Sequence, residues 1–84
     1  DALAAAVNAQ RAEESQQATL VQSRRSLELA ELEYREGSAN LQEVLDAQRV
    51  YRAARAELIA ARYELASAWV EIERLRASPG GKTE

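Results

Sequence analysis

Apolar residues recur every seven positions along the C-terminal half of the chain, a spacing typical of a helix that packs along a coiled-coil seam. This apolar column consists of Val44, Tyr51, Leu58, Leu65 and Ile72. A second, half-polar column runs beside it: Leu41, Gln48, Arg55, Arg62, Trp69 and Arg76. We therefore expect a seam in which one column is apolar throughout and the other is partly polar.

Small residues form two further columns with the same spacing. One reads Ala47, Ala54, Ala61, Ala68 and then Leu75, and the other reads Asp46, Ala53, Ala60, Ser67 and Arg74. Stacked small residues let another helix approach closely, so we expect this helix to contact neighbours on two sides. The N-terminal half has a weaker stripe, made of Leu20, Leu27, Ala30 and Tyr34.

The only glycine between Asp1 and Pro79 is Gly37, and residues suited to helix caps follow it. Gly37 suits a left-handed C-cap, and Ser38 or Asn40 can cap the next helix. Asn40 followed three residues later by Glu43 is close to a capping box. The pattern predicts an all-α fold, an antiparallel two-helix hairpin or coiled coil. The alternative is one continuous helix with a tolerated glycine, at a cost of about 1 kcal/mol.

The expected boundaries follow from these signals: a first long helix over 1–36, a tip turn over 37–40, a second long helix over 41–77 and a tail over 78–84. Ser78, Pro79, Gly80 and Gly81 should stop the second helix, because proline cannot continue it. We expect residues 82–84 to be disordered or a terminal remnant.

Composition narrows the function. The 84 residues carry a net charge of -3 and contain no Cys, His or Met. No catalytic constellation, phosphate-binding loop, metal site or cofactor site is indicated, so we do not expect an enzyme. The mild acidity argues against a nucleic-acid partner. A chain that starts at Asp and has no apolar run of roughly 20 residues reads as a piece of a longer protein without a spanning helix.

Two acids next to the corner, Glu43 and Asp46, have two readings. Both could simply stabilise the positive N-terminus of the second helix. Alternatively, repeated about a symmetry axis, they could form acidic rings at a mouth, where such rings select and bind cations.

The stretch "AELEYREGSANLQEVLDAQRVYRAARAELIAARYELASAWVEIERL" resembles the outer-membrane efflux proteins of the TolC family. The resemblance rests on a tyrosine upstream of the glycine, then Val-Leu-Asp-Ala, then an alanine-rich helix with Ala-Arg-Tyr. It covers roughly residues 26–76. The resemblance implies a periplasmic segment of an outer-membrane protein, one helical hairpin of a periplasmic α-helical barrel that is a homotrimer in the full-length protein.

The same resemblance implies roles for the residues around the corner. The tip residues Gly37, Ser38, Leu41 and Val44 would contact a periplasmic adaptor protein and, through it, an inner-membrane pump. Tyr34, Glu43 and Asp46 would belong to the gate at the channel entrance. Glu36 and Ser38 depart from the residues usual in the family's tip, and Ala39 stands where an arginine helps to lock the prototype closed.

Two alternatives stay open from the sequence. The chain could be the hairpin of the periplasmic adaptor (membrane fusion protein) itself, although Glu36 breaks the adaptor tip spacing that Arg25 and Leu29 begin. It could also be a coiled-coil scaffold without a transport role. In isolation, the hairpin could dimerise to cover its extra apolar face, giving a four-helix assembly.

Overall fold

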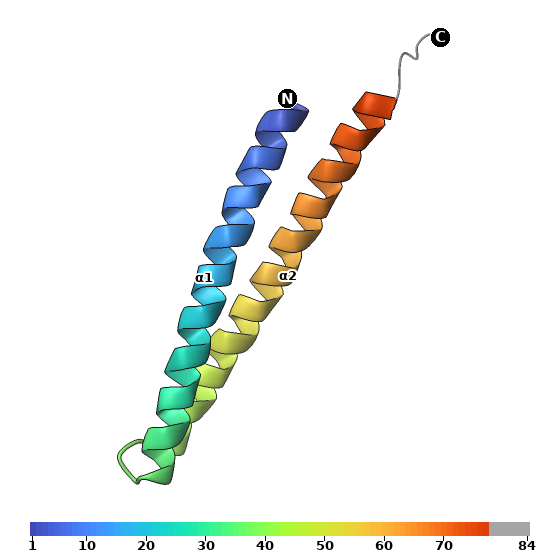
Figure 1. Ribbon diagram of the computed structural model, residues 1–84. Coiled ribbons are helices and arrows are strands. Elements are labelled where there is room, and N and C mark those ends of the chain that lie inside the picture. Colours follow the sequence, from blue (N-terminus) through green and yellow to red (C-terminus); the bar gives the residue numbers. More distant parts are fainter. Residues whose placement is uncertain (78–84) are drawn as a thin grey trace.

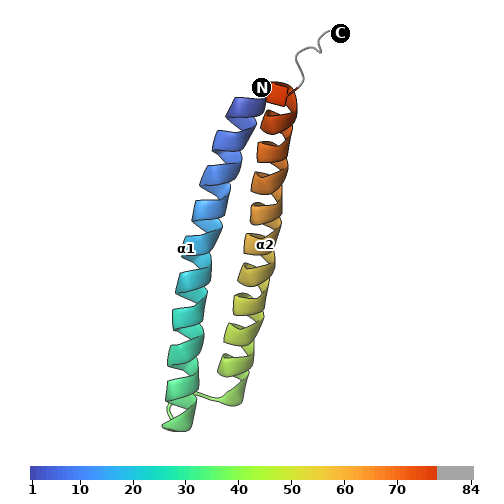
Figure 2. The same ribbon diagram turned by 45° about the vertical axis from the view of Figure 1, so that its right-hand side comes forward.

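Two long helices, joined by a short corner, make up the chain. In the computed structural model, α1 (Ala2–Arg35) and α2 (Leu41–Ala77) run antiparallel and lie side by side in both views of Figures 1 and 2. The predicted all-α antiparallel hairpin is therefore confirmed. The structure describes residues 1–77. The expected helix stop at 78–81 and the tail at 82–84 lie outside the described residues.

The helices form because nothing in them opposes helix formation. Neither contains Pro or Gly, and Ala, Leu, Glu, Arg and Gln dominate both. The Asp1 side chain accepts a 2.7 Å hydrogen bond from the Ala4 N–H and so caps the start of α1. The 37 residues of α2 span about 55 Å at a rise of ~1.5 Å each.

The predicted apolar column of α2 is the seam, but its companion column differs from the prediction. Val44 and Leu58 are buried, with 6% and 4% of their surface exposed. Beside them lies the alanine column, in which Ala54 is 5% exposed. The prediction that the half-polar column completes the seam is wrong, since Leu41 and Trp69 are each 51% exposed. Alanine lets the helices approach closely, whereas seam arginines would have to be desolvated.

The stripe of α1 that meets this seam is built mainly from small and polar residues. Ala6 and Ser23 are buried, and the Ser23 hydroxyl donates a 3.0 Å hydrogen bond to the Leu20 carbonyl. Leu20, Leu27 and Ala30 are half-buried as their stripe predicts, but Tyr34 is 46% exposed. A buried serine is acceptable here because its hydroxyl has a partner within the helix.

An ion pair links the two helices near their middle. The Arg62 side chain donates through Nε to the Glu13 carboxylate at 3.3 Å, and the Glu13 side chain is only 13% exposed. Glu13 lies in line with Ala6 and Leu20 at heptad spacing, so this carboxylate occupies a seam position. A carboxylate is tolerated at this position because an arginine reaches it from the side.

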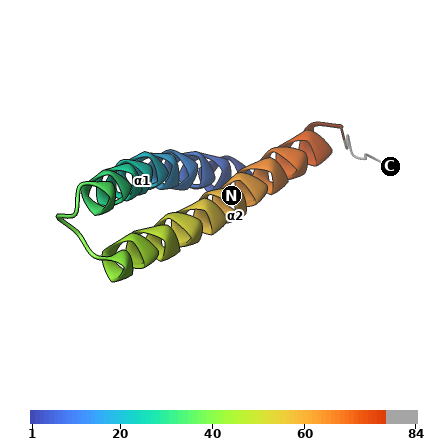
Figure 3. The same cartoon turned by 90° about the horizontal axis from the view of Figure 1, so that it is seen from below.

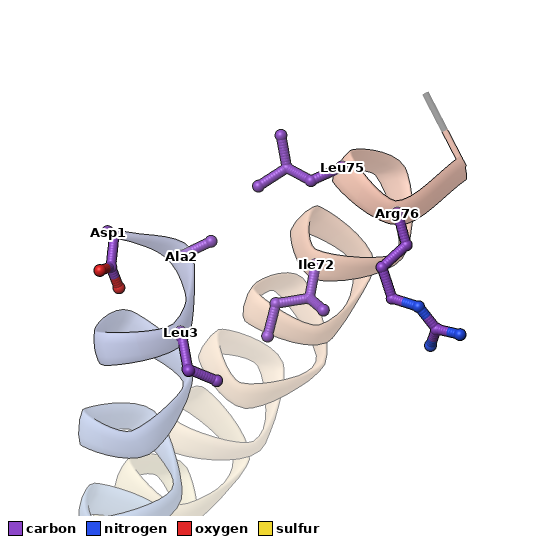
Figure 4. Close-up of a pocket in the computed structure, with 6 residues that line it drawn as sticks. All are labelled: Asp1, Ala2, Leu3, Ile72, Leu75 and Arg76. Carbon is purple, nitrogen blue, oxygen red and sulfur yellow. The ribbon is translucent and has the colours of Figure 1, made fainter. Parts of the chain in front are cut away.

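At the open end, Ala2 and Ile72 line one surface groove between the helices. Figure 4 shows Leu3 and Ile72 directed into this groove, whereas the Arg76 side chain, which also lines it, extends away from α1. Ala2 and Ile72 line the same groove, and Glu13 pairs with Arg62. From these two levels and the heptad spacing we infer a register that places small residues opposite large ones. By this register Leu65 lies opposite Ala9 and Leu20 opposite Ala54. The hairpin thus fills its seam by size complementarity.

One seam leaves a thin core. Among residues 1–77, no large side chain has less than 2% of its surface exposed. Ile59 and Tyr63 are 63% and 73% exposed, on the side of α2 away from α1. Small chains with so little buried area usually need an added partner for stability.

We predict that Ala54→Leu destabilises the hairpin by about 1–3 kcal/mol, because the added atoms overpack a closely approached seam. The adjacent Ala53 is exposed, so Ala53→Leu is the matched control and should leave stability nearly unchanged. Circular dichroism during urea unfolding of the 84-residue chain measures both. Equal midpoints for the two variants would contradict the seam assignment.

Candidate functional site

The corner begins with a helix end that only glycine suits. Gly37 has a φ of +83° and directly follows the C-cap residue Glu36. The Ser38 N–H donates to the Glu33 carbonyl at 2.8 Å, and the Gly37 N–H donates to the Tyr34 carbonyl at 3.1 Å. These two bonds define a Schellman motif, in which the left-handed residue turns the chain back over the last helical turn.

The same carbonyl holds the rest of the turn. The Glu33 carbonyl also accepts from the Ala39 N–H at 3.2 Å and from the Ser38 hydroxyl at 3.2 Å. Ser38 therefore helps to end α1 and does not cap α2. Because several donors converge on one carbonyl, the corner is a defined turn and not a loose loop. Figure 3 shows this turn joining the ends of α1 and α2.

Asn40 and Glu43 start α2 with a reciprocal capping box. The Glu43 N–H donates to Asn40 Oδ1 at 2.9 Å, and the Asn40 N–H donates to Glu43 Oε1 at 3.1 Å. Of the two caps that the sequence allowed, the structure uses Asn40. These two N–H groups have no partner within the helix and are satisfied by the capping box. The direction in which α2 leaves the corner is therefore fixed.

The residues proposed to contact an adaptor differ in their accessibility. Gly37 and Ser38 are exposed at the apex, and Leu41 is 51% exposed in the first turn of α2. Val44 is 6% exposed and packs into the seam. In this hairpin Val44 anchors the tip from inside and does not lie on its surface.

The acids proposed for the gate are both exposed, and each is engaged locally. Glu43 uses one oxygen for the capping box. Asp46 accepts hydrogen bonds through Oδ1 from Gln42 Nε2 and from Arg49 Nη1, each at 2.9 Å. Their placement near the N-terminus of α2 therefore has a stabilising role whatever else they do. The sequence did not point to Gln42 and Arg49 as the partners of Asp46.

The two flanks of α2, on either side of the seam, carry different side chains. A residue one place after a seam residue is turned about 100° to one flank, and a residue one place before it to the other. The first set, here called the arginine flank, comprises Leu45, Gln48, Arg52, Arg55, Ile59, Arg62, Ala66, Trp69 and Glu73. The second set, the glutamate flank, comprises Glu43, Asp46, Val50, Ala53, Glu57, Ala60, Glu64, Ser67 and Glu71.

One predicted tip residue and the two predicted gate acids lie on opposite sides of α2. Leu41 lies one heptad before Gln48 and so belongs to the side of the arginine flank, whereas Glu43 and Asp46 lie on the glutamate flank. Tyr34 is exposed in the last turn of α1. The hairpin can therefore present an apolar tip contact on one side while its acids face another environment.

The described residues contain neither a metal site nor a membrane span. No group of three or more acidic, His or Cys side chains within 1–77 could hold a metal ion. In the same range, neither helix has a stretch apolar enough to cross a membrane.

Comparison with known proteins adds one finding. The family model described as outer membrane efflux protein matches residues 1–78. No curated protein and no solved structure matches the chain.

We predict that Gly37→Ala lowers the free energy of unfolding by about 1–2 kcal/mol, because an L-residue with a side chain is strained at this φ. No atom lies within 4 Å of the position that the new Cβ would take, so the cost is one of backbone conformation and not of collision. Gly37→Asn, which tolerates the left-handed region better, should lose less. Equal losses in thermal unfolding would show that strain does not govern this corner.

Proposed function

Because the chain belongs to the outer membrane efflux protein family, whose members are transport channels and not enzymes, we propose that this hairpin forms part of the wall and entrance of a periplasmic tunnel. The full-length protein is a homotrimer in this proposal. Its hairpin tips meet a periplasmic adaptor, which connects the channel to an inner-membrane pump for tripartite export.

The doubly capped corner carries this proposal. Its Schellman motif and its capping box hold the ends of two long helices in one fixed geometry. A tip that must meet a partner in register benefits from such preorganisation, because little conformational freedom is then lost on binding.

Glu43 and Asp46 act at the entrance in this proposal. Threefold symmetry would bring three copies of each acid around the axis near the tip. Concentrated negative charge of this kind attracts cations and slows their passage by binding them. Their local hydrogen bonds leave each carboxylate exposed, so their charge would still reach the passage.

Gly37, Ser38 and Leu41 form the adaptor contact, with Val44 holding it from within the seam. Leu41 supplies the exposed apolar area, and Gly37 leaves room for close backbone approach, since nothing lies within 4 Å of its missing Cβ. Tyr34 belongs to the gate, where its exposed ring could contact a neighbouring helix.

Two other readings have less support. The family match favours the channel over the adaptor hairpin, because the matched model describes the outer membrane efflux protein. A scaffold without a transport role would leave unexplained the pattern at the corner, a tyrosine upstream of Gly37 followed by Val-Leu-Asp-Ala-Gln.

We predict that Glu43→Gln combined with Asp46→Asn weakens block of single-channel current by a trivalent cation at least about tenfold at low salt. The measurement is the blocking constant in planar bilayers, with the cation added on the periplasmic side of the assembled channel. Glutamine can replace glutamate in a capping box, so the corner should keep its structure.

The matched control for this block experiment is Glu71→Gln with Glu73→Gln, which removes two charges from the same helix farther from the tip. The control should change the block much less than the double variant at the entrance. If block is unchanged in the entrance variant, Glu43 and Asp46 serve only the helix N-terminus, and their gate role is refuted.

We also predict that Leu41→Glu reduces adaptor binding by about tenfold or more, since a charged group would be placed in the apolar contact. Leu45→Glu is the control, because Leu45 is 41% exposed about one turn farther from the tip. Binding of the purified channel to immobilised adaptor measures both variants. Equal binding by the Leu41 variant and the parent would exclude Leu41 from the contact.

A further inference from the structure

The packing between the two helices is not uniform along the hairpin. All three buried residues of α2, Val44, Ala54 and Leu58, lie between the corner and the middle of the helix. From Arg62 to Ala77, no residue of α2 is buried. The half of the seam farther from the corner therefore holds less buried apolar surface, and regions of this kind open locally before the rest of a structure does.

The first third of α1 contributes little to that half of the seam. Residues 2–13, here called the arm, turn only alanines and one glutamate toward α2. Ala6 is the one buried residue of the arm, and its large apolar side chains Leu3 and Val7 are 66% and 43% exposed. Nearer to the corner, α1 instead places Leu20 in the seam, where it is half-buried. The arm is thus packed more weakly than the part of α1 that follows it.

One charged contact ties the arm to α2. Within residues 1–77, the bond from Arg62 Nε to the Glu13 carboxylate is the one hydrogen bond that joins side chains of the two helices. The Glu13 side chain is 13% exposed, and a carboxylate withdrawn from water needs a compensating partner. The Arg62 side chain is 56% exposed, so salt and other anions can compete for it.

We propose that the arm stays on α2 only while Arg62 compensates the charge of Glu13, so that this pair is the latch of a segment that opens alone. When Arg62 is drawn away, Glu13 is left unpaired in the seam, and the arm separates from α2 because its carboxylate is then hydrated. The corner and the adjoining seam stay closed, since Val44 and Leu58 are buried there. The opening involves neither the entrance nor an adaptor, so it holds or fails independently of the proposed function.

An open arm uncovers large side chains of α2. Leu65 and Ile72 lie half-buried in the seam opposite the arm, and Trp69 lines a groove together with Leu3 and Val7. Trp69 is the only tryptophan of the chain, so its fluorescence reports on the arm without an added label. A detached segment of this length is only marginally helical in water, so its amide hydrogens should exchange quickly.

Hydrogen exchange followed by NMR tests the latch in the 84-residue chain. Arg62→Met should raise the exchange rates of amides in residues 6–13 at least about tenfold, whereas those in residues 20–35 should change less than about twofold. Glu13→Ala combined with Arg62→Met also removes the unpaired carboxylate and should restore the rates of the parent. Arg52→Met is the matched control, because Arg52 is exposed and takes part in none of the described ion pairs.

Salt gives a second readout, which serves even if Arg62→Met does not fold. Raising NaCl from about 50 to about 500 mM should speed exchange in the arm of the parent and shift Trp69 emission to longer wavelength, because the ion pair is screened. Glu13→Ala has no carboxylate to compensate and should show neither response.

Each of four results would overturn the latch. Equal acceleration in residues 6–13 and 20–35 of the Arg62 variant would mean that the hairpin opens as one unit. An effect of Arg52→Met as large as that of Arg62→Met would mean that any lost arginine loosens the arm. If the double variant fails to restore slow exchange, Arg62 does not act through Glu13. If arm exchange in the parent is independent of salt, the pair does not control the arm.

Discussion

The close packing of small residues of one helix against large residues of the other is the interaction on which the rest of the hairpin depends. The exposed fractions of Ala6, Ala54 and Leu58 are all about 5% or less, so the helix axes are held near each other along most of their length. This closeness lets Arg62 reach Glu13. It also fixes which residues of α2 are turned to either flank, because a helix with one buried stripe has no rotational freedom left.

The corner follows from the same constraint. Two helices this close need a short connection that reverses the chain without pushing them apart, and the turn between Arg35 and Leu41 does so. A left-handed glycine ends α1, and Asn40 with Glu43 begins α2, so the backbone groups freed by the reversal find partners. Val44 joins the corner to the seam, since it follows the capping box directly and is itself buried.

The sequence predicted the hairpin, the apolar column and the corner because each has a local signal: a heptad, a lone glycine and a cap residue. It did not predict which column accompanies Val44 and Leu58 in the seam. Leu41 and Trp69 gave the half-polar column two large apolar members, which suggested a seam position. Alanine beside a large partner nevertheless packs more closely than arginine does. Glu13 gave no signal either, because its stability in the seam depends on Arg62, which lies 49 residues away along the chain. Cross-helix relations of this kind depend on register, and register emerges only when both helices are paired.

Because the seam and the register are fixed, the two flanks of α2 are two different surfaces of the folded hairpin. Glu43 and Asp46 extend the glutamate flank to the corner, whereas Leu41 continues the arginine flank there. In a wall built from such hairpins, the difference between the two flanks would therefore extend to the tip. The acids would face one environment there and an apolar residue would face another. Arg49, which binds Asp46, lies at the outer edge between the flanks. It moderates the acidic charge next to the corner but leaves Glu57 and Glu64 unpaired along the helix. The same helix thus carries a partly neutralised acid at its tip and unpaired carboxylates farther along the glutamate flank.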